Sequence, residues 1–98
     1  MGFRAIAINK KDNVATALTS LGKDTRISVE IHDRTETIKL LSDIPMGHKF
    51  ALQDMEEGDP VIKYGEPIGQ CTAKICSGEH VHVHNVISRP KEEKYEEF

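Results

Sequence analysis

Three of the five histidines of the chain lie in one short run, His80-Val81-His82-Val83-His84. Alternation with a period of two predicts a β-strand, because successive side chains of a strand point to opposite faces. The three imidazoles would then share one face and the valines the other. Imidazole is a common metal ligand and titrates near neutral pH, so this face is a candidate for metal binding or proton transfer. The alternative is an exposed polar strand face without chemistry.

Strand geometry limits how many of these histidines can share one ion. At a rise of about 3.3 Å per residue, the first and third lie about 13 Å apart at Cα, and neighbours lie about 7 Å apart. Two neighbours can therefore converge on a metal, and the other ligands must come from elsewhere. The residues that could supply them are Glu79, His48, Asn9 or a residue of another protein chain.

The size and composition of the chain indicate one small domain with an aliphatic core. The chain has 98 residues, no tryptophan and only 5% aromatic residues. Its net charge of -3 gives no electrostatic case for binding nucleic acid or an acidic membrane. No apolar stretch approaches the length of a membrane span or a signal peptide, so a cytoplasmic location is expected. Cys71 and Cys76 are then expected to be free thiols.

The pattern of the whole chain predicts a mainly-β fold with one short helix. Asp12 or Asn13 can cap this helix and Gly22 can end it. Its apolar face would consist of Val14, Ala17, Leu18 and Leu21. Short aliphatic runs broken by glycine and proline predict a compact, strongly bent sheet. The expected strands cover residues 3–8, 26–32, 37–41, 44–52, 61–64, 70–75 and the histidine run.

Several linked motifs resemble, in the same order, those of the altronate/galactarate dehydratase family. They cover residues 12–18, 44–52, 58–69, 75–78 and 78–86, so the resemblance spans nearly the whole chain. The part that matches is the small N-terminal module of the family, an SAF domain. The resemblance therefore implies an SAF domain with a β-clip fold over residues 3–88, followed by a charged C-terminal tail over residues 89–98.

The resemblance also implies a lyase function. Members of the family remove water from sugar acids such as altronate or galactarate to give 2-keto-3-deoxy acids, and the module precedes a larger catalytic portion, fused or separate. We therefore expect the small subunit or N-terminal module of a hydro-lyase, inactive alone and partnered by a large catalytic dehydratase subunit. The alternatives are the small subunit of a sulfolactate sulfo-lyase, or a metal- or carbohydrate-binding β-clip module without catalysis. An exposed strand edge could also pair two copies into a homo-oligomer.

Site residues follow from the histidine run and from the resemblance, which suggests Fe2+ as the divalent metal. The predicted metal ligands are His80, His82 and His84. The predicted catalytic residues are His82, His84 and His48, the last as an imidazole that faces the substrate beside the histidine strand. The predicted substrate contacts are Asn85, Lys63 and Lys49, with Asn85 orienting a substrate hydroxyl or an imidazole and the lysines pairing with a carboxylate.

Overall fold

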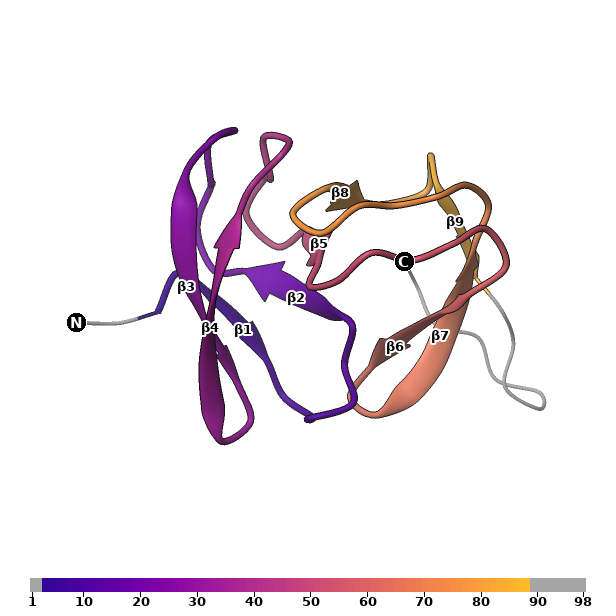
Figure 1. The fold of residues 1–98 in the computed structure, drawn as a ribbon, viewed down its shortest axis with the longest axis horizontal. Coiled ribbons are helices and arrows are strands. Elements are labelled where there is room, and N and C mark those ends of the chain that lie inside the picture. The colour runs from indigo at the N-terminus through magenta and orange to yellow at the C-terminus, as the bar shows by residue number, and fades with distance from the viewer. Residues whose placement is uncertain (1–2, 89–98) are drawn as a thin grey trace.

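The computed structural model describes residues 3–88, and all regular secondary structure in this range is β-strand. The larger sheet has the order β4-β3-β1-β2-β5-β8. Its strands are β1 (Ala5–Ala7), β2 (Val14–Ala17), β3 (Arg26–Ile31), β4 (Arg34–Lys39), β5 (Lys49–Ala51) and β8 (His80–Val81). The smaller sheet has the order β6-β7-β9, with β6 (Pro60–Lys63), β7 (Glu66–Cys71) and β9 (Val86–Ser88). Figure 1 shows β5 and β8 between the other strands of the larger sheet and the smaller sheet.

The prediction of a mainly-β fold is confirmed, but the predicted short helix is wrong. The segment forms β2, which pairs with β1 through Ala5↔Ala17 and with β5 through Val14↔Ala51. A strand that is paired on both sides satisfies its backbone polar groups without a helix. Asp12 does not cap a helix either, because its carboxylate accepts a hydrogen bond from the backbone N–H of Gly65 at 2.8 Å.

The predicted hairpin over residues 26–41 is confirmed, with β3 and β4 paired along their whole length from Arg26↔Lys39 to Ile31↔Arg34. The predicted strand over 70–75 is wrong beyond its first residues, because β7 ends at Cys71. The chain then enters a loop in which Ile75 forms a single bridge with Met55. A buried apolar residue in an irregular loop gives the same local signal as one in a strand.

The buried side chains form two hydrophobic clusters, one for each end of the molecule. The first includes Val29, Leu40 and Phe50, and the second includes Val61 and Val81. Phe50 on β5 belongs to the first cluster, whereas Val81 on β8, the strand paired with β5, belongs to the second. The β5–β8 pair therefore lies at the junction of the two clusters.

Four loops of the same conformation organise the chain, over residues 18–25, 41–48, 52–59 and 72–79. Each contains a buried apolar residue, followed three positions later by a residue with positive φ. The buried residues are Leu21, Ile44, Met55 and Ile75, and the positive-φ residues are Asp24, Gly47, Gly58 and Gly78. The loops cross in two pairs, Leu21 with Ile44 and Met55 with Ile75, each joined by two reciprocal backbone hydrogen bonds of 2.7–2.9 Å.

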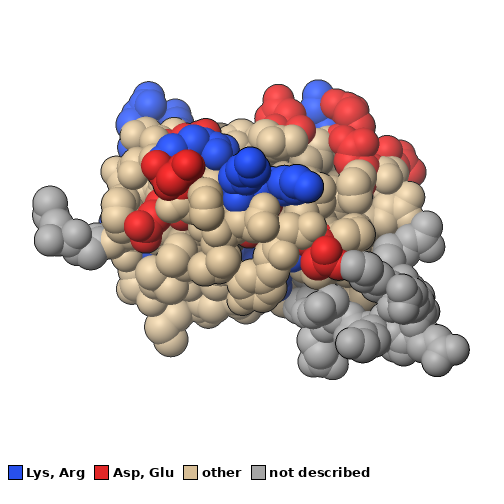
Figure 2. All heavy atoms as spheres, turned by 90° about the horizontal axis from the view of Figure 1, so that it is seen from below, with Lys and Arg blue, Asp and Glu red and all other residues tan. Residues whose placement is uncertain are grey.

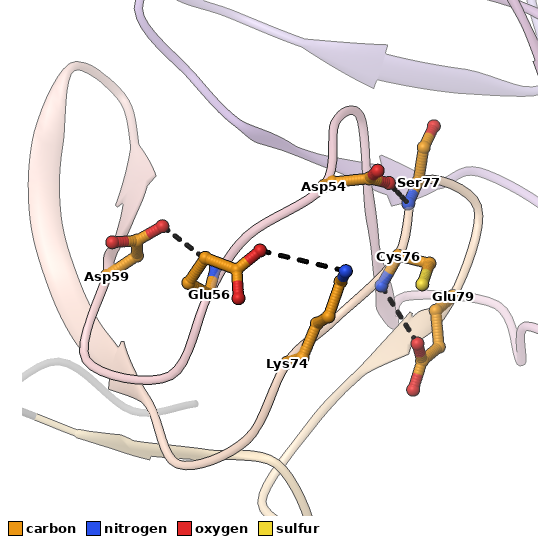
Figure 3. A network of polar contacts seen from close by, with 7 residues as sticks. All are labelled: Asp54, Glu56, Asp59, Lys74, Cys76, Ser77 and Glu79. Carbon is orange, nitrogen blue, oxygen red and sulfur yellow. Dashed lines mark hydrogen bonds and ion pairs between the residues drawn. The ribbon is translucent and has the colours of Figure 1, made fainter.

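Carboxylates hold the second pair of loops in shape, as Figure 3 shows. Asp59 accepts a hydrogen bond from the N–H of Glu56 at 2.8 Å, and Glu79 accepts one from the N–H of Cys76 at 2.9 Å. These two bonds occupy the same position in loops 52–59 and 72–79. Both carboxylates therefore satisfy an N–H of their own loop that has no strand partner.

Other expectations from the sequence concern the thiols, the surface and the C-terminal residues. Cys71 is buried, Cys76 is partly buried, and both are free thiols as predicted.

No helix within residues 3–88 is long and apolar enough to cross a membrane. On the face drawn in Figure 2, basic side chains lie beside acidic ones and uncharged residues cover much of the surface between them. The predicted charged tail over 89–98 lies outside the described residues.

Two glycines at equivalent loop positions should differ in their tolerance of alanine. Gly47 and Gly78 have φ values of +85° and +87°, but a Cβ at Gly47 meets nothing within 4 Å, whereas one at Gly78 meets the backbone carbonyl oxygen of Lys39. We expect Gly47→Ala to lower the free energy of unfolding by about 1–2 kcal/mol, the cost of a left-handed alanine. Gly78→Ala should cost at least about 2 kcal/mol more, because the β4 backbone must move. Urea denaturation of both variants checks this, and equal losses would contradict it.

Candidate metal centre

The predicted histidine strand is much shorter than its alternation suggests. β8 ends at Val81, and residues 82–85 form a turn that leads into β9. The backbone N–H groups of Asn85 and Val86 both donate to the carbonyl oxygen of His82 at 3.1 Å. Val81 is fully buried but Val83 is 69% exposed, so the expected valine face does not exist beyond the first valine.

His48 reaches this segment through the pairing of β5 with β8. The register aligns Phe50 with His80 and Lys49 with Val81, so the next position outward places His48 opposite His82. The centroids of the rings of His48 and His82 lie 4.4 Å apart, with the rings stacked. Residues separated by more than thirty positions in the sequence therefore form one imidazole cluster.

The cluster contains His48, His80 and His82 at its centre and His84 at its rim. The centroid of the His80 ring lies 5.1 Å from that of His48, 5.6 Å from that of His82 and 5.3 Å from that of His84. Nδ1 of His48 and Nε2 of His80 lie 2.9 Å apart. One of these two nitrogens must carry the proton that they share, because two bare lone pairs would repel each other.

The three central histidines have ring nitrogens that lie close to one another. One ring nitrogen from each of His48, His80 and His82 lies within 4.8 Å of the other two. Ligand nitrogens around a tetrahedral metal with bonds of about 2.0–2.1 Å lie about 3.3 Å apart, so small side-chain adjustments would bring this set onto one ion. His84, a predicted ligand, is not a member of the set. The set combines two histidines of the run, His80 and His82, with His48 from outside it.

The electrostatics of the cluster favour neutral imidazoles. The pKa of His80 is lowered first by burial and then by the neighbouring His48, His84 and His82. The pKa of His82 is lowered by burial, by His48, by the ammonium of Lys49 and by His84. A neutral imidazole is the form that binds a metal, so the lowered pKa values of His80 and His82 suit metal binding.

The loop that carries His48 explains why an imidazole can occupy this position. His48 is the last residue of loop 41–48. Asp59 and Glu79 are the last residues of the corresponding loops, and each accepts a hydrogen bond from the backbone N–H three residues earlier. In loop 41–48 the residue three before is Pro45, which has no N–H to satisfy. No carboxylate is needed there, and the His48 ring lies in the cluster instead. Aligning the four loops in the sequence would have related His48 to Glu79, the residue that precedes His80.

The structure brings one of the predicted lysines to the cluster and leaves the other elsewhere. Lys49 is only 8% exposed and lies close enough to His82 to act on its pKa. Lys63 instead lines a separate hollow of about 200 Å³ with Ile8, and its ammonium lies 4.7 Å above the ring of Tyr64.

The remaining residues that could have supplied ligands, or contacts to a substrate, are engaged in backbone hydrogen bonds. Glu79 accepts from the N–H of Cys76 within its own loop. Asn9 accepts from the N–H of Lys11 at the β1–β2 turn. Asn85 is 4% exposed and bonds to the backbone of the histidine segment. Its amide therefore supports the backbone that carries His80 and His82.

Comparison with known proteins places this chain in a family. The family described as the altronate/galactarate dehydratase SAF domain matches residues 3–89. Over 80 residues, the chain is 49% identical to the altronate dehydratase of Escherichia coli (strain K12) and 45% identical to that of Bacillus subtilis (strain 168). It is also 50% identical over 57 residues to the (2R)-sulfolactate sulfo-lyase subunit alpha of Chromohalobacter salexigens.

These relatives differ in how much of their own length the chain covers. The matches to the altronate dehydratases cover 82% of this chain but only 15% of each relative. The match to the Chromohalobacter subunit covers 58% of this chain and 61% of that subunit. The chain therefore corresponds to a small part of the dehydratases and to most of a lyase subunit.

The lowered pKa values predict a loss of stability in mild acid. Because the pKa values of His80 and His82 are lower in the folded chain than in the unfolded chain, the unfolded state binds protons first as the pH falls. We expect the free energy of unfolding to be constant above the unfolded pKa of about 6.5 and to fall below it. Urea denaturation between pH 7.5 and 5.5, with a chelator present, measures this slope. His80→Gln should flatten it and His32→Gln, in the exposed β3–β4 turn, should not; equal slopes in all three proteins would rule out the cluster as the cause.

Proposed function

The chain belongs to the altronate/galactarate dehydratase family through its SAF domain, and we propose that it acts as the small subunit or N-terminal module of a sugar-acid dehydratase. In this proposal it works with a large catalytic chain to remove water from a hydroxy acid such as altronate or galactarate. The product is a 2-keto-3-deoxy acid. The names of the two altronate dehydratases support the reaction, and their much greater length supports the need for a further catalytic portion.

The observation that carries the proposal is the cluster of His48, His80 and His82. Three imidazoles whose ring nitrogens lie within 4.8 Å of one another suit a divalent transition metal. All three rings are only partly buried, so a position on the solvent side is open to a substrate. When bound, a divalent metal, Fe2+ by the resemblance to the family, would supply Lewis-acid assistance to the departing hydroxide.

The other residues of the site would handle protons and charge. Dehydration of a sugar acid needs a base for the proton beside the carboxylate, stabilisation of the enediolate and an acid for the leaving hydroxide. His84 is exposed and its ring lies 5.3 Å from that of His80, and in this proposal it transfers protons. The positive charge of Lys49 beside His82 favours a carboxylate at the same rim. The large chain would supply the groups that this small domain lacks.

A second candidate is the small subunit of a sulfolactate sulfo-lyase. The chain covers 61% of the Chromohalobacter subunit alpha, against 15% of either altronate dehydratase. The same site would then act on a sulfonated hydroxy acid, with sulfite in place of water as the leaving group. A third candidate function is that of a metal- or carbohydrate-binding module without catalysis.

Binding of Co2+, whose absorption reports its coordination, tests the metal site directly. We expect the isolated chain to bind one equivalent of Co2+ and expect His48→Gln, His80→Gln and His82→Gln each to weaken binding by at least about 100-fold, because each removes a ligand. His84→Gln is the matched control from the same segment and should weaken binding much less. If His84→Gln and His82→Gln had equal effects, the ligand set would be the histidine run itself; if the unsubstituted chain bound no Co2+, the metal site would be rejected.

Reconstitution with the large chain tests the lyase function. The tagged chain is used to recover its partner from a lysate of the source organism, and the purified partner is then assayed with and without the tagged chain. We expect 2-keto-3-deoxy acid to form from altronate or galactarate only in the mixture. His82→Gln in the small chain should lower the rate by about 100-fold or more, because it removes a group at the reaction centre.

Parallel assays separate the alternatives. Release of sulfite from sulfolactate, without dehydration of sugar acids, would favour the sulfo-lyase subunit. Recovery of no large chain, together with tight Co2+ binding, would favour the metal-binding module. An active mixture that is indifferent to His48→Gln, His80→Gln and His82→Gln would contradict a catalytic role for the cluster.

A further inference from the structure

The side chain of Asn85 makes two hydrogen bonds to the backbone that carries the clustered histidines. Its Oδ1 accepts from the N–H of His82 at 3.0 Å, and its Nδ2 donates to the carbonyl oxygen of His80 at 2.9 Å. The two bonds flank Val81, which is fully buried. The amide of Asn85 therefore replaces the edge of a neighbouring strand, because a side-chain amide offers the same donor and acceptor as a peptide group.

The same device occurs a second time, away from the histidines. Oδ1 of Asn13 accepts from the N–H of Ile62 at 2.8 Å, and its Nδ2 donates to the carbonyl oxygen of Pro60 at 2.9 Å. These bonds flank Val61, which is also fully buried. The two segments follow corresponding loops, 52–59 and 72–79. Asn13 and Asn85 are thus a matched pair, and only Asn85 holds a segment that carries imidazoles.

The histidine segment needs such a clamp because its strand pairing is minimal. β8 has two residues, and its pairing with β5 ends at Lys49↔Val81. His82 lies beyond this pair, and its N–H is directed to Asn85. A change of 1 Å in the backbone of His80 or His82 would alter the convergence of their nitrogens, which the cluster holds within 4.8 Å of that of His48.

We propose that Asn85 is a positioning residue that preorganises His80 and His82 to bind a divalent metal together with His48. The proposal rests on the proposed metal site. Asn85 does not touch the metal or the substrate; it acts on the geometry of two ligands through their backbone. Both polar atoms of its amide are used for this purpose, and the side chain is 4% exposed.

The matched asparagines make the test internally controlled. Asn85→Ala and Asn13→Ala each remove one clamp of similar burial, 4% and 7% exposed, and of similar hydrogen-bond lengths. Thermal unfolding measures the stability of each variant. Absorption titration, carried out well below the melting temperature of either variant, measures the affinity for Co2+. We expect both substitutions to lower the melting temperature to a similar degree. Only Asn85→Ala should weaken Co2+ binding, by about 10- to 100-fold, the effect typical of groups that support metal ligands.

A second variant keeps the test decisive if Asn85→Ala does not fold. Asn85→Asp keeps the shape and the acceptor for His82 but loses the donor to His80. The negative charge of the aspartate would by itself strengthen the binding of a cation. Weaker Co2+ binding in this variant would therefore indicate that Asn85 acts by positioning the ligands and not through charge. The absorption bands at saturating Co2+ should also change in the Asn85 variants and not in Asn13→Ala.

Three outcomes would overturn the proposal. One is Co2+ affinity and spectra in the Asn85 variants that equal those of the unsubstituted chain. Another is equal weakening by Asn13→Ala, which would indicate general loosening of the fold. Failure of the unsubstituted chain to bind Co2+ would reject the metal site and this proposal together, whereas normal binding with an indifferent Asn85 would reject the proposal alone.

Discussion

The antiparallel pairing of β5 with β8 is the interaction on which both the fold and the candidate site depend. It is short, with only Lys49↔Val81 and Phe50↔His80 in register. Phe50 contributes to one hydrophobic cluster and Val81 to the other, so the pair joins the two halves of the core. The same register brings His48 against His82. The core and the imidazole cluster thus depend on the same register, since any shift of this pair would separate the imidazoles and open the junction between the hydrophobic clusters.

The crossing loops give this junction its rigidity with little regular structure. In each pair, the positive-φ residue of one loop donates its N–H to the carbonyl oxygen just before the partner loop, as Gly78 does to Ala51 and Gly58 to Cys71, both at 2.8 Å. Backbone groups that would be orphaned in a small domain are satisfied in this way. Because the loops are equivalent in conformation but not in sequence, one of them has an imidazole, that of His48, where two others have a carboxylate. At His48 this replacement leaves no N–H without an acceptor, because the residue three positions earlier is Pro45.

The cluster combines features that oppose each other electrostatically. Four imidazoles and the ammonium of Lys49 lie together. Burial first, and then these neighbouring groups, lower the pKa values of His80 and His82. Proton binding is disfavoured there, so the nitrogen lone pairs stay available for a metal. The match to this chain covers only 15% of each of the much longer altronate dehydratases.

The sequence by itself determined the mainly-β class and the β3–β4 hairpin, and it identified His80 and His82 as candidate ligands, because these depend on alternation and residue type within short windows. It did not determine β2, since Val14, Ala17, Leu18 and Leu21 suit a helix as well as a strand, and only pairing with β1 and β5 decides between them. Nor did it determine the end of β8 after Val81 or the meeting of His48 with His80 and His82. The end of β8 coincides with the hydrogen bonds of Asn85 to His80 and His82. The meeting of the histidines follows from a strand register that links residues about thirty positions apart, and such long-range contacts leave no periodic signal in the chain.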